Sequence, residues 1–263
     1  MTIAFWSSVR QSGVTATLAS VCVIWTEIYG ERLTVTANHL SNDGILSCFL
    51  GEIKRENRER REFCYCFGEP EYFRRLHMQQ KDTERLLKQG IRYLPMDGRE
   101  EPDYFTGSGL SSVQKQTNPE EFLMIDVAAG ENQSSINLLN QVDILVCVLP
   151  KEIESTDHFL LSFSWNLNQC FFILPKKKKS KGYSKNKFCT KYHIPKKQVA
   201  EVWYHEEFAL TVWKGQLVPH LRSGIRCVGE NQWEKPKEEW VKSLMETAVL
   251  LRKFADERRK TDA

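Results

Sequence analysis

The residues best suited to chemistry lie in two short segments that each follow an apolar stretch. The first is SSVRQSGVTAT (7–17), which follows the apolar residues 2–6 and precedes a helical pattern. A polar turn with a glycine, then a threonine and a helix start, is the order that places backbone N–H groups around phosphates. The second segment is DVAAG (126–130), which follows apolar residues ending at Ile125. Together they are typical of a phosphate and Mg²⁺ site.

Each of these residues has an expected role. Gly13 would make the tight turn, and Gly130 would let its loop approach a terminal phosphate. The hydroxyl of Thr15 and the carboxylate of Asp126 would bind Mg²⁺, which prefers oxygen ligands. Asp126 has an alternative role as a cap for the loop that follows it. The residues expected to contact a nucleotide are Arg10, Gln11, Ser12, Gly13, Val14, Thr15, Ala16, Asp126 and Gly130.

The elements that position this site follow from an alternation of apolar and helical patterns. Expected strands are 2–6, 32–37, 91–95, 121–126, 143–150, 169–175 and 198–204, and expected helices are 15–29, 69–80, 81–90, 134–142, 151–165, 186–193, 205–217 and 236–257. Ser134 or Ser135 is expected to cap the helix at 134–142. Residues 51–62 are a charged helix face or loop, and residues 97–109 are expected to form a loop. The pattern predicts a doubly wound, mostly parallel α/β sheet with helices on both faces, in one domain spanning 1–263. Ligands of such sheets bind at the carboxyl ends of the strands, so the two segments should face each other.

The phosphate segment resembles the MinD/ParA branch of P-loop ATPases, whose loop is K-G-G-x-G-K-[ST]. The alignment sets Val9 at the first lysine, Arg10 and Gln11 at two glycines, Gly13 at the last glycine, Val14 at the second lysine and Thr15 at the Mg²⁺-binding threonine. Residues 122–150 resemble the family's switch segment and next strand. Residues 202–218 resemble its late segment, with Trp203 at a proline position. The resemblance rests on order and spacing, and it is nearest to TadZ- and CpaE-like pilus-assembly localisation proteins.

The departures from that pattern bear on catalysis. Both family lysines that neutralise phosphate charge are replaced by valines, Val9 and Val14. Charge stabilisation dominates phosphoryl transfer, so hydrolysis should fall by orders of magnitude. Where the family's second strand ends in acids, the chain offers only Asn38. We therefore expect no catalytic residue, although Arg10 could return some charge to the loop.

The resemblance implies a catalytically degenerate MinD/ParA-like protein that acts as a localisation or scaffold factor for a pilus or secretion apparatus. ATP and Mg²⁺ are its implied ligands if it binds any, and a homodimer is implied for the same reason. Two alternatives stay open. One is a slow ATPase that uses Arg10 or a lysine from 176–179 in place of the lost lysines, and the other is a DNA-partition accessory.

Composition limits the other function classes. The chain has 263 residues and a net charge of +3, which argues against a general nucleic-acid or membrane surface. No apolar run approaches the roughly 20 residues that span a bilayer, and no signal peptide is expected. Cys22, Cys48, Cys147 and Cys170 lie in apolar strings and indicate a reduced, cytoplasmic protein. Recruitment to the inner face of the membrane stays open.

Four further features favour structural roles. Cys64 with Cys66, and Cys189 with His193, lack the extra ligands of a zinc site. The lysine-rich segment 175–187 is expected to be a solvated loop, with contact to nucleic acid, anionic lipid or phosphate as the alternative. The helix at 236–257 is expected to pack on the sheet rather than on a membrane, because acids interrupt its basic face. The cluster at 205–207 is expected to start a helix rather than to catalyse hydrolysis.

Overall fold

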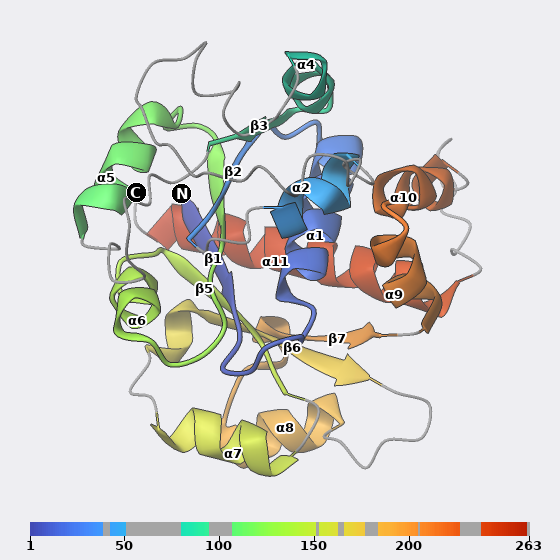
Figure 1. Ribbon diagram of the computed structural model, residues 1–263. Helices are drawn as coiled ribbons and strands as arrows, with labels where there is room; N and C mark the ends of the chain where they lie inside the picture. Colours follow the sequence, from blue (N-terminus) through green and yellow to red (C-terminus); the bar gives the residue numbers. More distant parts are fainter. Residues whose placement is uncertain are drawn as a thin grey trace.

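Seven parallel strands form one sheet in the computed structural model of the chain (Figure 1). The structure describes residues 1–38, 43–50, 80–94, 107–150, 153–162, 166–176, 184–204, 206–226 and 238–261. The strand order is β3-β2-β4-β1-β5-β6-β7. The strands are β1 (Thr2–Trp6), β2 (Leu33–Ala37), β3 (Ile91–Tyr93), β4 (Phe122–Asp126), β5 (Ile144–Val148), β6 (Cys170–Lys176) and β7 (Val199–Trp203). The predicted doubly wound α/β fold is confirmed, and every strand pair in the described part is parallel.

Helices connect these strands and form the outer layers. The α-helices are α1 (Val14–Tyr29), α2 (Asp43–Leu50), α4 (Gln80–Lys88), α5 (Gly107–Gln116), α6 (Gln133–Leu139), α7 (Ile153–Ser162), α8 (Lys185–Tyr192), α9 (Glu206–Trp213), α10 (Leu217–Arg226) and α11 (Glu239–Thr261). Two short 3₁₀ turns precede β6 and β7, at Leu167–Gln169 and Lys196–Gln198.

The core is split by the sheet into two apolar clusters. Side chains on one face of β1, such as Ile3 and Phe5, pack with α1, α2, α10 and α11. Side chains on the other face, such as Ala4 and Trp6, pack with α5, α6, α7 and α8. Every residue of β1, β4 and β5 is buried, as expected for strands covered on both faces. Helices therefore cover both sides of the sheet (Figure 1).

The C-terminal helix α11 packs on the sheet, as its apolar stripe indicated. Its buried apolar side chains are Trp240, Val241, Leu244, Met245, Ala248, Leu251, Phe254 and Ala255. The indole N–H of Trp25 on α1 donates to the carbonyl oxygen of Ala248 at 2.9 Å, which fixes the two helices together. In the described part of the chain, no helix is long and apolar enough to cross a membrane.

Three local predictions were wrong. Residues 107–109 were expected in a loop but begin α5, which buries Leu110 and Val113 against the sheet. The cap of α6 is Asn132 rather than Ser134 or Ser135, because its side chain accepts from the N–H of Ser135 at 2.8 Å.

The third error concerns the segment after β7. One helix was expected at 205–217, but α9 ends at Trp213 and α10 begins at Leu217. Gly215 lies between them with φ 65°, a left-handed conformation that ends a helix at little cost for glycine.

Several sequence predictions fall outside the described residues. They concern residues 51–62, the helix at 69–79, Cys64, Cys66, residues 95–106, the lysines at 177–179, His205 and residues 236–237.

Candidate nucleotide site

The segment between β1 and α1 has the backbone of a tight loop. Gln11 has φ 58° and Gly13 has φ 87°, so both lie in the left-handed region that favours glycine. Gln11 stands at a glycine position of the MinD/ParA pattern, and the backbone keeps the conformation that a glycine would adopt most easily. The loop is therefore tightly turned even though two of its glycines are absent.

The side chains of this loop carry little charge toward its interior. Val9, Arg10 and Gln11 are exposed, whereas Val14 is 7 % exposed and belongs to the apolar cluster around α1. Val14 also begins the helix, and no side chain caps its first turn. The free N–H groups of that turn can bind an anion, but the side chain at the lysine position only contributes to the core.

Thr15 and Asp126 lie together, as the sequence predicted. The hydroxyl of Thr15 donates to Oδ2 of Asp126 at 2.8 Å. The neighbouring strands β1 and β4 bring them there, with Phe5 paired to Asp126 in register. Asp126 is 1 % exposed. A hydroxyl and a carboxylate are both hard oxygen ligands, so this pair has the donor chemistry of a Mg²⁺ site.

The segment 126–130 is tied to the end of β1. The N–H of Val127 donates to the carbonyl of Phe5, and the N–H of Gly130 donates to the carbonyl of Ser7, each at 3.0 Å. The indole N–H of Trp6 donates to the carbonyl of Gly130 at 3.1 Å. These bonds hold Gly130 beside the loop that follows β1.

Asn38 joins the end of β2 to the same loop. Its backbone N–H donates to the carbonyl of Asp126 at 3.0 Å, and its Oδ1 accepts from the N–H of Ala128 at 2.6 Å. Burial, with a smaller contribution from the charge of Asp126, raises the pKa of the Cys48 thiol to about 12. Cys48 is therefore a neutral thiol near the carboxylate of Asp126.

Tyr204 is a residue of this site that the sequence analysis missed. Its hydroxyl bonds to that of Thr17 at 2.7 Å, and Thr17 in turn donates to the carbonyl of Gly13. Burial raises the pKa of Tyr204 to about 12, opposed by the bond to Thr17, so the phenol stays protonated. An aromatic residue directly after the last strand was the available indication, because carboxyl strand ends converge on the ligand site.

Substituting Gly13 by alanine should lower the stability of the fold. A Cβ at Gly13 would lie 2.8 Å from Cε1 of Tyr204, and the φ of 87° is unfavourable for any L-residue. We expect Gly13→Ala to lower the free energy of unfolding by about 2–3 kcal/mol, measured by urea denaturation.

The double variant Gly13→Ala with Tyr204→Ala separates the clash with Tyr204 from the backbone strain at Gly13. If the clash contributes, Gly13→Ala should cost less in the Tyr204→Ala background than in the wild-type chain. An equal cost in both backgrounds would assign the whole effect to backbone strain.

Lys176, the last residue of β6 and the first of the lysines at 176–179, is already engaged. Lys176 pairs with Glu201 at 3.5 Å and lies over the ring of Trp203 at 4.9 Å from its centroid. Cys189 and His193 were not expected to bind metal, and the described residues contain no group of three or more histidines, cysteines or acids that could hold a metal ion.

Comparison with known proteins identifies the fold. No protein-family model and no curated protein matches the sequence. MinD of Pyrococcus horikoshii, solved with Mg-ADP, superposes with a TM-score of 0.63 at 14 % identity, covering 98 % of this chain and 99 % of that one. MinD in the MinC:MinD complex of Aquifex aeolicus superposes with a TM-score of 0.62 at 12 % identity, covering 96 % of this chain and 95 % of that one. A ParA family ATPase of Chlorobium tepidum superposes with a TM-score of 0.58 at 13 % identity, covering 94 % of this chain and 97 % of that one. The chain thus has the fold of the MinD/ParA P-loop ATPases.

Proposed function

We propose that this protein is a MinD/ParA-like scaffold or localisation factor that has lost efficient ATP hydrolysis. The observation that carries the proposal is the state of the two lysine positions. Val14 is buried in the core and Val9 is an exposed apolar side chain, so neither provides charge for a phosphate. Charge-assisted contacts are the strong ones in phosphate sites, and their loss weakens both binding and catalysis.

The retained features support a vestigial ligand site rather than an unrelated loop. Gln11 and Gly13 keep a tight backbone, and Thr15 contacts Asp126. This arrangement supports weak binding of Mg²⁺ with a nucleotide, held by backbone N–H groups at the start of α1 and by these two oxygen ligands. In the described part of the chain, Asn38 replaces the acids that the family places after its second strand.

Protein contacts are the means by which such a factor would act. One protein of the same fold is solved in a MinC:MinD cell division complex, so the fold is compatible with a bound protein partner. The resemblance to TadZ- and CpaE-like proteins favours a partner in a pilus or secretion apparatus. A homodimer across the nucleotide sites, and recruitment to the inner face of the membrane from the cytoplasm, belong to the same proposal.

Hydrolysis and binding assays on the intact chain test the proposal. We expect no Mg²⁺-dependent ATP hydrolysis above the protein-free rate, and calorimetric binding of Mg·ATP no tighter than millimolar. Asp126→Ala should abolish whatever binding there is, because it removes both the carboxylate and the partner of Thr15. Micromolar binding that Asp126→Ala abolishes, together with steady turnover, would contradict the loss of catalysis.

The slow-ATPase alternative rests on Arg10, which is exposed at the first glycine position of the loop. If Arg10 supplies the missing charge, Arg10→Met should remove both turnover and nucleotide binding. Under the scaffold proposal Arg10→Met changes neither. The matched control is Arg32→Met, which neutralises an exposed arginine outside the loop.

A further inference from the structure

Three side chains from three different elements bind the backbone of the DVAAG segment that follows β4. The indole N–H of Trp6, at the end of β1, donates to the carbonyl of Gly130 at 3.1 Å. Oδ1 of Asn38, directly after β2, accepts from the N–H of Ala128 at 2.6 Å. The hydroxyl of Ser135, on α6, donates to the carbonyl of Ala128 at 3.2 Å. We call Trp6, Asn38 and Ser135 the clasp.

Backbone bonds hold the same segment between the two strands that flank β4. In the sheet, β4 lies between β2 and β1. On the β1 side, the N–H of Gly130 donates to the carbonyl of Ser7 at 3.0 Å. On the β2 side, the carbonyl of Asp126 accepts from the N–H of Asn38 at 3.0 Å. The segment is therefore bound along both of its edges as well as by the clasp.

The clasp side chains are themselves held in place. Trp6 and Ser135 are fully buried, and the ring of Trp6 lies 5.4 Å from that of Phe159 on α7. The N–H of Ser135 donates to Oδ1 of Asn132, the cap of α6. Side chains locked by packing and hydrogen bonds hold the groups they contact in one geometry.

Two N–H groups of the segment are already engaged by the protein. Those of Ala128 and Gly130 donate to Asn38 and to the carbonyl of Ser7. A terminal phosphate can accept from them only if these bonds break, and the loss of the protein bonds offsets part of the gain. A ligand shifts a conformational equilibrium only by the difference in its affinity for the two conformations. The clasp makes that difference small, because a rearranged segment also loses the bonds from Trp6 and Ser135.

We propose that the clasp keeps the DVAAG segment in one conformation whether or not a nucleotide is bound, so that the segment does not respond to a terminal phosphate. The inference rests on the proposed function, because it takes the loop after β1 as the nucleotide site. It deepens that function by making the surface that the scaffold presents to its partner constitutive rather than controlled by the nucleotide.

Amide-resolved hydrogen exchange on the full chain tests the response to nucleotide. The samples contain no nucleotide, Mg·ADP or Mg·ATP, each nucleotide at millimolar concentration. We expect the exchange rates at Ala128 and Gly130 to be the same in all three samples. The same rates are expected in Val14→Lys, which has a lysine where the MinD/ParA pattern has its phosphate-binding lysine. A rate at either amide that Mg·ATP changes and Mg·ADP does not, in either chain, would overturn the proposal.

Variants of the clasp test whether its side chains fix the segment. Asn38→Ala should raise the exchange rate at Ala128 about ten-fold beyond what the drop in global stability accounts for, because it removes the acceptor of that N–H. Ser135→Ala should act in the same direction. The matched control is Ser134→Ala, since the hydroxyl of Ser134 donates to Asn132 rather than to the segment. If Asn38→Ala and Ser134→Ala both exchange at Ala128 only as their global stabilities require, the proposal is wrong.

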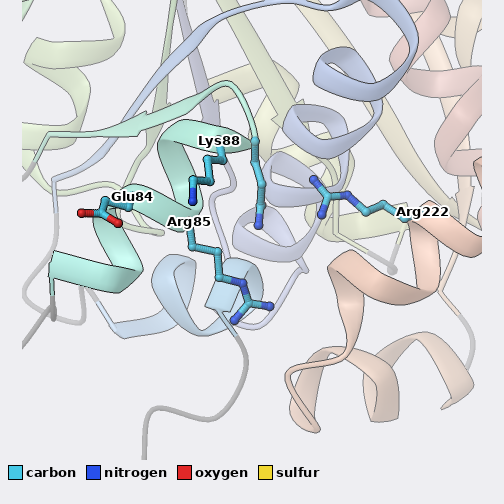
Figure 2. Close-up of a pocket in the computed structure, with 5 residues that line it drawn as sticks. Glu84, Arg85, Lys88 and Arg222 are labelled. Atoms are coloured by element: carbon cyan, nitrogen blue, oxygen red, sulfur yellow. The ribbon is translucent and has the colours of Figure 1, made fainter.

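A second cationic surface can also attract nucleotide phosphates, and one variant controls for it. Figure 2 shows a pocket between α4 and α10 that is lined by Glu84, Arg85, Lys88, Gln89 and Arg222. It lies near the amino ends of the strands, because the neighbouring Gly90 accepts from the N–H of Leu33 at the start of β2. In Lys88→Met, the exchange rates in the DVAAG segment should be the same with and without Mg·ATP, as in the wild-type chain.

The outcomes separate this inference from the proposed function. Steady Mg²⁺-dependent turnover with unchanged exchange at Ala128 and Gly130 would contradict the loss of catalysis and support the clasp. An exchange rate that Mg·ATP changes and Mg·ADP does not, without turnover, would retain the scaffold proposal and overturn the clasp.

Discussion

The Val14→Lys variant should bind Mg·ATP about ten- to one hundred-fold more tightly than the wild-type chain. A hydrogen bond to a charged group contributes about 1.5–3 kcal/mol, and each 1.4 kcal/mol is roughly a factor of ten in affinity. Val14 starts α1 between Gly13 and Thr15, where the MinD/ParA pattern has its phosphate-binding lysine. The methylene stem of a lysine can cover the apolar surface that Val14 covers and carry its ammonium to the edge of the loop.

The control for this gain is Val14→Met, which has a similar length but no charge. If the added ammonium binds phosphate, Val14→Met should leave the affinity for Mg·ATP at the wild-type value. Adding Val9→Lys to Val14→Lys should raise the affinity further, because Val9 is already exposed at the loop. Equal affinities of wild type, Val14→Met and Val14→Lys would show that the loop cannot hold a triphosphate even when charge is returned.

The doubly wound parallel sheet and the central contact of the site were predictable because they follow from strong local patterns. The segments 2–6, 122–126 and 144–148 are apolar on both faces, which only a doubly covered parallel sheet accommodates. Once β1 and β4 are neighbours, Thr15 and Asp126 follow them at the same edge of the sheet. Their 2.8 Å contact is therefore a consequence of topology and residue type.

The remaining features depend on tertiary contacts that no local pattern records. Tyr204 lies against Gly13 and bonds to Thr17, 187 residues away in the sequence, and its sequence neighbourhood indicates only the end of a strand. The start of α5 was missed because Gly107 and Gly109 favour a loop locally, whereas burial of Leu110 stabilises the helix. The cap of α6 likewise moved from the expected Ser134 or Ser135 to Asn132, a difference that only the geometry shows.

The loop after β1 has a tight backbone and carries valines, Val9 and Val14, at the two positions that align with lysines of the MinD/ParA pattern. Gln11 at φ 58° retains a conformation that costs an L-residue about 1–2 kcal/mol, and only the surrounding structure can hold it. Beside this loop, the N–H groups of Val127 and Gly130 donate to carbonyls of Phe5 and Ser7, and Trp6 of β1 donates to the carbonyl of Gly130. The scaffold proposal follows from this contrast, because a loop held in place without phosphate-binding charge can still provide a fixed surface.

Replacing Trp6 should lower stability and also release the loop at Gly130. Trp6 is fully buried, its ring lies 5.4 Å from that of Phe159, and its N–H donates to the carbonyl of Gly130. We expect Trp6→Ala to lower the free energy of unfolding by about 3–5 kcal/mol, because it leaves a large cavity. Trp6→Phe keeps most of the apolar volume but removes the donor, and it should cost about 1–3 kcal/mol.

Hydrogen exchange at the Gly130 amide distinguishes the loss of this tether from a general loss of stability. That N–H donates to the carbonyl of Ser7, and it should exchange faster in Trp6→Phe than the drop in global stability accounts for. The matched control is Trp25→Phe, which removes an equally buried indole whose N–H donates to Ala248 instead. Trp25→Phe should lose comparable stability, and its Gly130 amide should exchange no faster than the drop in global stability accounts for. If both variants accelerate hydrogen exchange at the Gly130 amide equally, Trp6 is a core residue only. Another contact then holds the loop at Gly130 beside the segment 7–17.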